Sequence, residues 1–303
     1  MIDFQHLRPE HKAQYDAVLF SCPPRGCEYS FANLSLWGQQ DVAFVHGCVA
    51  FFSHFHGKSL YPYPIGGGDR KAVLEEVLQD ARERDIPCHL SGLTAEDCQD
   101  LECWFPGQFH LRPSRDDFDY VYAIDDLADL KGRKYQKKRN HTNRFRAEHP
   151  DCTTVPLTPE TLPAARNMVN NWYRIRQEED PLGDYLPESI AMNRCFQNYT
   201  ALGMEGLLLL GGEEDLAVSI GSRMGEDIFD IHFEKAREDV AGAYSVINQE
   251  FARYLRRKYP ELAYLNREDD MGLDGLRKTK KSYLPHHMLE KYRADLREDN
   301  YDL

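Results

Sequence analysis

The sequence predicts an α+β protein with two domains, each built on a mixed sheet. Its 303 residues are about twice the length of a typical domain, so each half can bury a substantial core. The second half reads as two helices, three strands, a glycine turn, a helix, a strand and a basic helix. The first half repeats the strand, glycine turn and helix in a weaker form. These observations predict one architecture used twice.

In the first half, apolar alternation over 42–55 predicts a hairpin. A strand over 60–65 leads into a glycine turn at 66–68, and Asp69 is placed to cap the helix that follows. Residues 87–90 predict the next strand, before another short helix. We interpret the glycine turn as mainly structural, because a lone glycine run is weak support for phosphate binding.

The second half begins with helices that are expected to pack beside a sheet. Thr158 is a helix N-cap candidate, and apolar residues recur at helical spacing through Ile175. A second helix is expected over 187–199. Strands are predicted at 207–210 and 216–224, before a turn into the next strand.

The strand over 228–234 alternates apolar and ionisable residues with period two. The apolar face is expected to hold Phe229, Ile231 and Phe233. The ionisable face is expected to hold Asp230, His232 and Glu234. A solvated face of a half-exposed strand is the alternative interpretation. The turn and the helix after this strand favour a site for chemistry.

That turn contains Gly242, and it leads into a helix over 244–258 with a basic end, a strand ending at Asn266, and a basic helix over 275–285. A glycine before a helix lets the backbone approach a ligand closely. The free N–H groups of the first helical turn form an anion site. A phosphate could therefore bind at this turn.

At these residues the chain resembles the GNAT acyltransferase superfamily, in which acyl-CoA binds between two splayed strands with its pyrophosphate on the turn before a helix. It is more specifically similar to a soluble, largely uncharacterised family that shares the C-terminal domain of phosphatidylglycerol lysyltransferases. The motifs that carry this second resemblance lie at 131–145, 233–236, 242–244, 247–251, 265–268 and 276–283. The resemblance implies two tandem GNAT-like domains, as in the Fem aminoacyl transferases. We place them at 1–130 and 158–303, joined by a basic helix and linker at 131–157.

Acyl transfer to an amine needs a proton acceptor, a polarised carbonyl and a proton donor for the leaving group. The expected acceptor is Asp230, His232 or Glu234. Lys280 is expected to hold a phosphate or polarise the carbonyl, and Tyr283 to protonate the leaving group. A surface lysine and a packed aromatic residue are the alternatives. The residues expected to position the donor are Phe233, Arg237, Gly242, Ala243, Tyr244 and Asn266.

The formal net charge of −13 at pH 7 opposes binding to nucleic acid or anionic membrane at long range, but the basic residues are clustered. Every formally charged residue from Lys131 to Arg146 is basic, directly after an acidic stretch. Residues expected to contact phosphate or RNA are Arg133, Lys134, Lys137, Lys138, Arg139, Arg277 and Lys278. A solvated basic helix is the alternative interpretation.

The function expected is transfer of an acyl or aminoacyl group from acyl-CoA or aminoacyl-tRNA to a small-molecule amine or hydroxyl. A non-catalytic module that binds an anionic metabolite or RNA on a decayed acyltransferase fold is the alternative. Eight dispersed cysteines without a signal-peptide pattern predict reduced thiols and no metal site. No apolar run approaches the roughly 20 residues that span a bilayer, which favours the cytoplasm.

Overall fold

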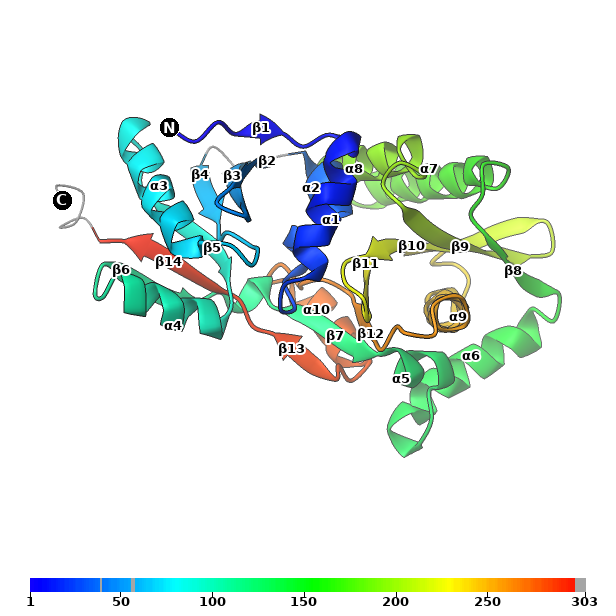
Figure 1. Ribbon diagram of the computed structural model, residues 1–303. Coiled ribbons are helices and arrows are strands. Elements are labelled where there is room, and N and C mark those ends of the chain that lie inside the picture. Colours follow the sequence, from blue (N-terminus) through cyan, green and yellow to red (C-terminus); the bar gives the residue numbers. More distant parts are fainter. Residues whose placement is uncertain (39, 56–57, 298–303) are drawn as a thin grey trace. The chain divides into compact units, whose positions relative to one another are not determined.

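The computed structural model describes residues 1–38, 40–55 and 58–297, which form two compact units (Figure 1). The first unit comprises 1–119, 269–277 and the described residues from 288 onward. The second comprises 120–268 and 278–287. Each unit contains one seven-stranded sheet. The architecture is therefore α+β with two mixed sheets, as predicted.

The first sheet runs, in spatial order, through β1 (Gln5–His6), β2 (Gln40–Val45), β3 (Cys48–Phe55), β4 (Lys58–Pro62), β5 (His89–Leu93), β14 (Tyr292–Leu296) and β6 (Phe109–Pro113). Its unit also contains α1 (Lys12–Phe20), α2 (Phe31–Trp37), α3 (Arg70–Glu83), α4 (Ala95–Trp104) and the short helices η1 (Pro9–His11), η2 (Cys27–Tyr29) and η3 (Arg115–Asp117). The Asp69 carboxylate caps α3 by accepting from the Ala72 amide at 3.0 Å, as expected from the sequence. Val73, Val77 and Ala81 then bury one face of α3 against the sheet.

The second sheet runs through β13 (His287–Leu289), β7 (Asp119–Ala123), β12 (Tyr264–Asn266), β11 (Ile228–Ala236), β10 (Glu214–Arg223), β9 (Met204–Gly211) and β8 (Cys152–Pro156). The remaining helices are α5 (Ile124–Asp129), η4 (Arg133–Tyr135), α6 (Gln136–Glu148), α7 (Leu162–Glu179), α8 (Leu186–Gln197), α9 (Ala243–Lys258) and α10 (Asp274–Lys281). In the second unit, α7 and α8 lie on one side of the sheet and α9 on the other (Figure 1). In the described residues, every helix is too short or too polar to cross a lipid bilayer.

The compact units interleave along the chain. The predicted boundaries, 1–130, 131–157 and 158–303, follow sequence order instead. β7 comes before residue 130 but pairs with β12 in the second sheet, and β14 comes after residue 158 but pairs with β5 and β6 in the first. The basic helix α6 belongs to the second unit, where it packs against α9.

A β-bulge in β11 changes which side chains share a face of the second sheet. Consecutive residues Ile220 and Gly221 of β10 pair with Phe233 and Ile231, so His232 is the extra residue of the bulge. Asp230 pairs with Ser222 and Glu234 with Ser219, and residues three apart on β10 point to opposite faces. Asp230 and Glu234 therefore lie on opposite faces. The expectation that Asp230, His232 and Glu234 share one face is wrong, because strict alternation stops at the bulge.

β11 and β12 are parallel neighbours over a short length only. Their pairs are Ile228 with Tyr264, Phe229 with Leu265, and Asp230 with Asn266. β12 ends at Asn266, whereas β11 continues to Ala236. The two strands therefore separate after Asp230, and the ionisable residues of β11 lie at and beyond that point.

We expect Gly221→Ala to lower the free energy of unfolding by at least about 2 kcal/mol, measured by urea denaturation. A Cβ at this position would lie 2.0 Å from the Asp230 carbonyl oxygen, so the strands would have to move apart at the bulge. Gly67→Ala is the control, because a Cβ there meets no atom within 4 Å. Equal stability of the two variants would contradict this account of the bulge.

Candidate functional site at the parting strands

The chain that leaves β12 is held by β7 rather than by β11. The Arg267 amide donates to the Tyr120 carbonyl at 3.0 Å, and the Tyr120 amide donates to the Glu268 carbonyl at 3.1 Å. Lys280 adds a third contact, because its Nζ donates to the Arg267 carbonyl at 2.6 Å. These bonds fix the backbone at Arg267 and Glu268, whose side chains then contact two different groups of residues.

The first group, which we name the phenol cluster, consists of Glu234, Arg267, Asn248, Tyr283, Lys138 and Ser245. Arg267 Nη2 donates to Glu234 Oε1 at 2.9 Å, and both side chains are only 11% exposed. Asn248 Nδ2 of α9 donates to the other Glu234 carboxylate oxygen at 3.1 Å. Within the described residues, Arg267 Nη1 has no hydrogen-bond partner. A buried guanidinium with a spare donor can accept an anionic group.

Two cations lie close to the ring of Tyr283 in the phenol cluster. Lys138 Nζ is 3.5 Å from the centre of its ring, and Arg267 Cζ is 4.9 Å from it. The phenol hydroxyl donates to Ser245 Oγ, in the first turn of α9, at 3.4 Å. Burial raises the pKa of Tyr283, so the phenol keeps its proton. It can therefore donate that proton to a leaving group.

Lys138 differs from its neighbours on the basic helix α6. In the described part of the chain it makes no ion pair, and its ammonium lies over Tyr283. Burial, with help from the Arg267 charge and against that of Glu234, lowers the pKa of Lys138 to about 8. From the sequence we expected Lys138 to contact phosphate or RNA, and in the structure its ammonium lies over the ring of Tyr283.

The second group, which we name the imidazole cluster, consists of Ser222, Asp230, His232 and Glu268. His232 Nδ1 lies 3.2 Å from Glu268 Oε1 and 3.5 Å from Asp230 Oδ2. Its Nε2 lies 2.9 Å from Ser222 Oγ. The His232 side chain is 2% exposed. Two carboxylates thus lie at one ring nitrogen and a hydroxyl at the other, an arrangement in which an imidazole can act as a general base.

Glu268 reaches the imidazole through an unusual backbone conformation. Its φ is 56°, in the left-handed region that non-glycine residues rarely adopt. The Asn266 side chain supports the turn, because its Oδ1 accepts from the Glu268 amide at 2.7 Å. Asn266, which we expected to position the donor, is fully buried and shapes this turn. Strained residues held by their surroundings concentrate at functional sites.

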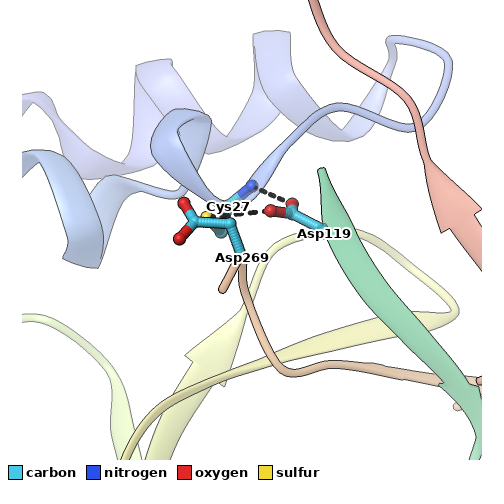
Figure 2. Close-up of side chains that lie close together, drawn as sticks. All are labelled: Cys27, Asp119 and Asp269. Carbon is cyan, nitrogen blue, oxygen red and sulfur yellow. Dashed lines mark hydrogen bonds between the residues drawn. The ribbon is translucent and has the colours of Figure 1, made fainter. Parts of the chain in front are cut away.

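Two groups in the described residues have donor atoms close enough to hold a metal ion. One is Asp230, His232 and Glu268 of the imidazole cluster. The other is Cys27, Asp119 and Asp269 of the first unit, which converge in Figure 2. Beside the second group, Lys291 Nζ lies 2.7 Å from Asp119 Oδ1. An ammonium thus already supplies positive charge there.

The predicted phosphate turn lies between β11 and α9. Gly242 has φ +94° at the N-cap of α9, and a Cβ there would lie 3.1 Å from the His141 carbonyl oxygen of α6. Arg237 is ion-paired with Glu214 at 2.9 Å and Asp239 at 2.7 Å. Ala243, Tyr244 and Phe233 are buried or half-buried around the turn. Its arginine is therefore neutralised by carboxylates, and α6 covers one side.

The remaining basic residues divide into engaged and solvent-facing ones. Arg139 donates to the backbone carbonyls of Leu130 and Gly132, and Arg277 is paired with Asp270 and Asp116. Lys134 is exposed but ion-paired with Asp126 at 3.1 Å. Of the residues predicted to contact phosphate or RNA, those that are exposed and form no ion pair within the described chain are Arg133, Lys137 and Lys278. Among the predicted contact residues, these three leave their full charge for an outside partner.

Sequence reasoning missed several members of the two clusters: Arg267, Glu268, Asn248, Ser245 and Ser222. A signal existed for Arg267 and Glu268, which follow directly on the strand that ends at Asn266. Residues at the end of a strand beside a separating neighbour are placed to line the opening. Ser222 carried no such signal, because only the bulge in β11 turns His232 toward it.

Two seven-stranded mixed sheets, with a parallel strand pair that separates before a helix, define a tandem GNAT-like protein. Within that class, the chain belongs to the family described as phosphatidylglycerol lysyltransferase, C-terminal, whose model matches residues 21–295. Both the predicted fold and the predicted family are confirmed. A search of curated protein sequences finds no match.

Three solved structures illustrate the similarity. A conserved protein of unknown function from Bacteroides thetaiotaomicron VPI-5482 is 34% identical, with a TM-score of 0.93, over 98% of this chain and 100% of that chain. L-PGS from Bacillus licheniformis is 16% identical, with a TM-score of 0.68, over 98% and 95%. FemX is 12% identical, with a TM-score of 0.59, over 98% of each. At these low identities, the last two similarities show the fold alone.

We expect the free energy of unfolding to rise between pH 8 and about 10.4 more steeply in the wild-type protein than in Lys138→Met. The folded-state pKa of Lys138 is about 8 and that of an unfolded lysine about 10.4, so in this window the unfolded chain binds the additional proton. Below pH 8 the buried ammonium lowers the free energy of unfolding by its full amount, and this loss of stability disappears as the pH rises to about 10.4. Chemical denaturation at a series of pH values measures it. Lys137→Met, at an exposed position, should keep the wild-type slope; parallel curves for wild type and Lys138→Met would contradict the assignment.

Proposed function

We propose that this protein transfers an acyl or aminoacyl group from a phosphate-bearing carrier to an amine or hydroxyl acceptor, at the parting of β11 and β12. The observation that supports this most is the pair of clusters on the two faces of β11. One offers a proton acceptor, His232, and the other a proton donor, Tyr283, beside two cations. Acyl transfer needs both kinds of group.

In the proposed reaction, the acceptor nitrogen or oxygen attacks the donor carbonyl and passes a proton to His232. Of the three predicted acceptors His232 is the best suited, because two carboxylates lie at one of its ring nitrogens, whereas Glu234 is held in an ion pair by Arg267. The bond to the carrier then breaks, and the phenol of Tyr283 protonates the leaving atom. Lys138 and Arg267 stabilise the negative charge that develops there. Lys280 is a positioning residue, since its ammonium holds the Arg267 backbone.

An aminoacyl-tRNA donor has more support than acyl-CoA. Arg237, at the turn where a GNAT diphosphate would bind, is already paired with Glu214 and Asp239. The family name, with its lysyl transfer, also points toward aminoacyl chemistry. On α6 and the turn before it, Arg133 and Lys137 remain exposed for phosphate contacts.

We expect Tyr283→Phe to lower the rate of transfer by about 10²-fold or more, because the leaving group loses its proton donor. The measurement is single-turnover transfer from a panel of aminoacyl-tRNAs and from acetyl-CoA. Tyr185→Phe is the matched control, since the hydroxyl of that half-buried residue bonds only Asp180 among the described residues. Full turnover in both Tyr283→Phe and Lys280→Met would remove the two residues from the mechanism. Donor binding without transfer from any donor would favour the non-catalytic binding module.

We expect tRNA binding to weaken with salt, and the double variant Arg133→Gln/Lys137→Gln to lower the slope of log K against log salt by about 2. For each phosphate contact that is removed, binding of the tRNA releases one counterion fewer. Fluorescence anisotropy at several salt concentrations measures this slope. Lys58→Gln/Lys71→Gln, at two exposed positions of the first unit, should leave the slope unchanged. An unchanged slope in the first double variant would count against tRNA contact at α6.

A further inference from the structure

The second unit contains a cavity that neither cluster uses. Its volume is about 630 Å³, within the roughly 300–1,000 Å³ of typical small-molecule sites. It is lined by α7, by the first residues of β10 and by the loop that directly follows β11. The cavity therefore adjoins the strand that carries His232 and Glu234.

The lining of this cavity is acidic. Its carboxylates belong to Glu179, Glu214, Asp215, Glu238 and Asp239. Its two guanidiniums are engaged: Arg237 pairs with Glu214 and Asp239, and Arg176 pairs with Glu179 at 3.2 Å and with Glu238. Five carboxylates against two guanidiniums leave a formal charge of −3. This charge repels phosphates and attracts cations.

Asp215 is the carboxylate with the most to gain from a cation. It is half-buried, and in the part of the chain that the structure describes no side chain bonds or ion-pairs with it. Burial raises the pKa of Asp215, since no positive group offsets the loss of hydration. A bound ammonium would supply that positive charge.

The cavity lining also has an apolar part, a wall formed by α7. Met168, Trp172 and Ile175 contribute to it, and Ile175 is 38% exposed although it is a large hydrophobic residue. The indole of Trp172 already attracts cations: Lys235 Nζ lies 4.1 Å and Arg176 Cζ 5.5 Å from its centre. A ligand that suits both properties has methylene groups and more than one positive charge.

We propose that this cavity binds an aliphatic polyamine and that this amine is the acceptor of the transfer reaction. The acceptor role depends on the proposed function, whereas the binding does not. The ammonium groups meet Asp215 and the acidic rim, and the methylene chain covers Met168 and Ile175. The negative charge of the cavity excludes the donor phosphates, which bind at the basic residues instead. Donor and acceptor therefore bind at different places because their charges have opposite signs.

Isothermal titration calorimetry with spermidine tests the binding. We expect Asp215→Asn to weaken spermidine binding at least 10-fold, and Glu238→Gln, at an exposed rim position, to weaken it less. Glu226→Gln is the matched control: it removes the same charge from the turn at the other end of the β10–β11 hairpin and should bind as the wild type does. Uncharged 1,6-hexanediol should not bind. Equal affinity of all three variants, or equal binding of the diol, would overturn the site.

Mass spectrometry of spermidine after incubation with the accepted donor tests the acceptor role. Acylated spermidine, with a higher KM for spermidine in Asp215→Asn and a lower kcat in Tyr283→Phe, would support it. Acylation of another acceptor but never of spermidine would overturn the acceptor role. Asp215-dependent binding with no transfer from any donor would instead mean that the proposed function fails while the cavity keeps its ligand class.

Discussion

β11 and β12 are paired only as far as Asp230 and Asn266, and beyond these residues the two chains part. β11 stays paired with β10 on both sides of the bulge at His232, and the chain after Asn266 follows β7. Side chains, rather than backbone groups, therefore meet across the opening. The ion pair between Glu234 and Arg267 is the main such contact, and its burial means that removal of either partner would leave an unpaired charge.

The two clusters owe their different chemistry to this geometry. Arg267 and Glu268 are consecutive, but their side chains reach different clusters. The guanidinium of Arg267 joins the phenol cluster, and the carboxylate of Glu268 joins the imidazole cluster. The phenol cluster carries excess positive charge, and the imidazole cluster excess negative charge. The chain has a net charge of −13, yet two cations gather at Tyr283. One is the buried Arg267, and the other is Lys138, which α6 carries to the ring. The charge of each cluster therefore depends on where the charged residues lie rather than on the net charge of the chain.

Most elements of the fold could be predicted from the sequence, because periodicity, glycine turns and caps are local signals. The strand from Ile228, the helix after Gly242 and the cap at Asp69 all appear where expected. The bulge could not be predicted, since one extra residue in a strand leaves no mark in an alternating pattern. It reversed the face of Glu234 relative to Asp230. The contact of Lys138 with Tyr283 depends on tertiary packing, so a basic run alone suggested only an outward-facing surface.

The interleaved units also bear on how the chain folds as it is synthesised. In the first sheet, β14 lies between β5 and β6 and pairs with both. Until β14 leaves the ribosome, nothing bridges β5 and β6, and the edges with which they pair to β14 stay unpaired. The first unit thus begins to be translated before the second unit and is completed after it. No single cut of the polypeptide can release it as an intact fragment.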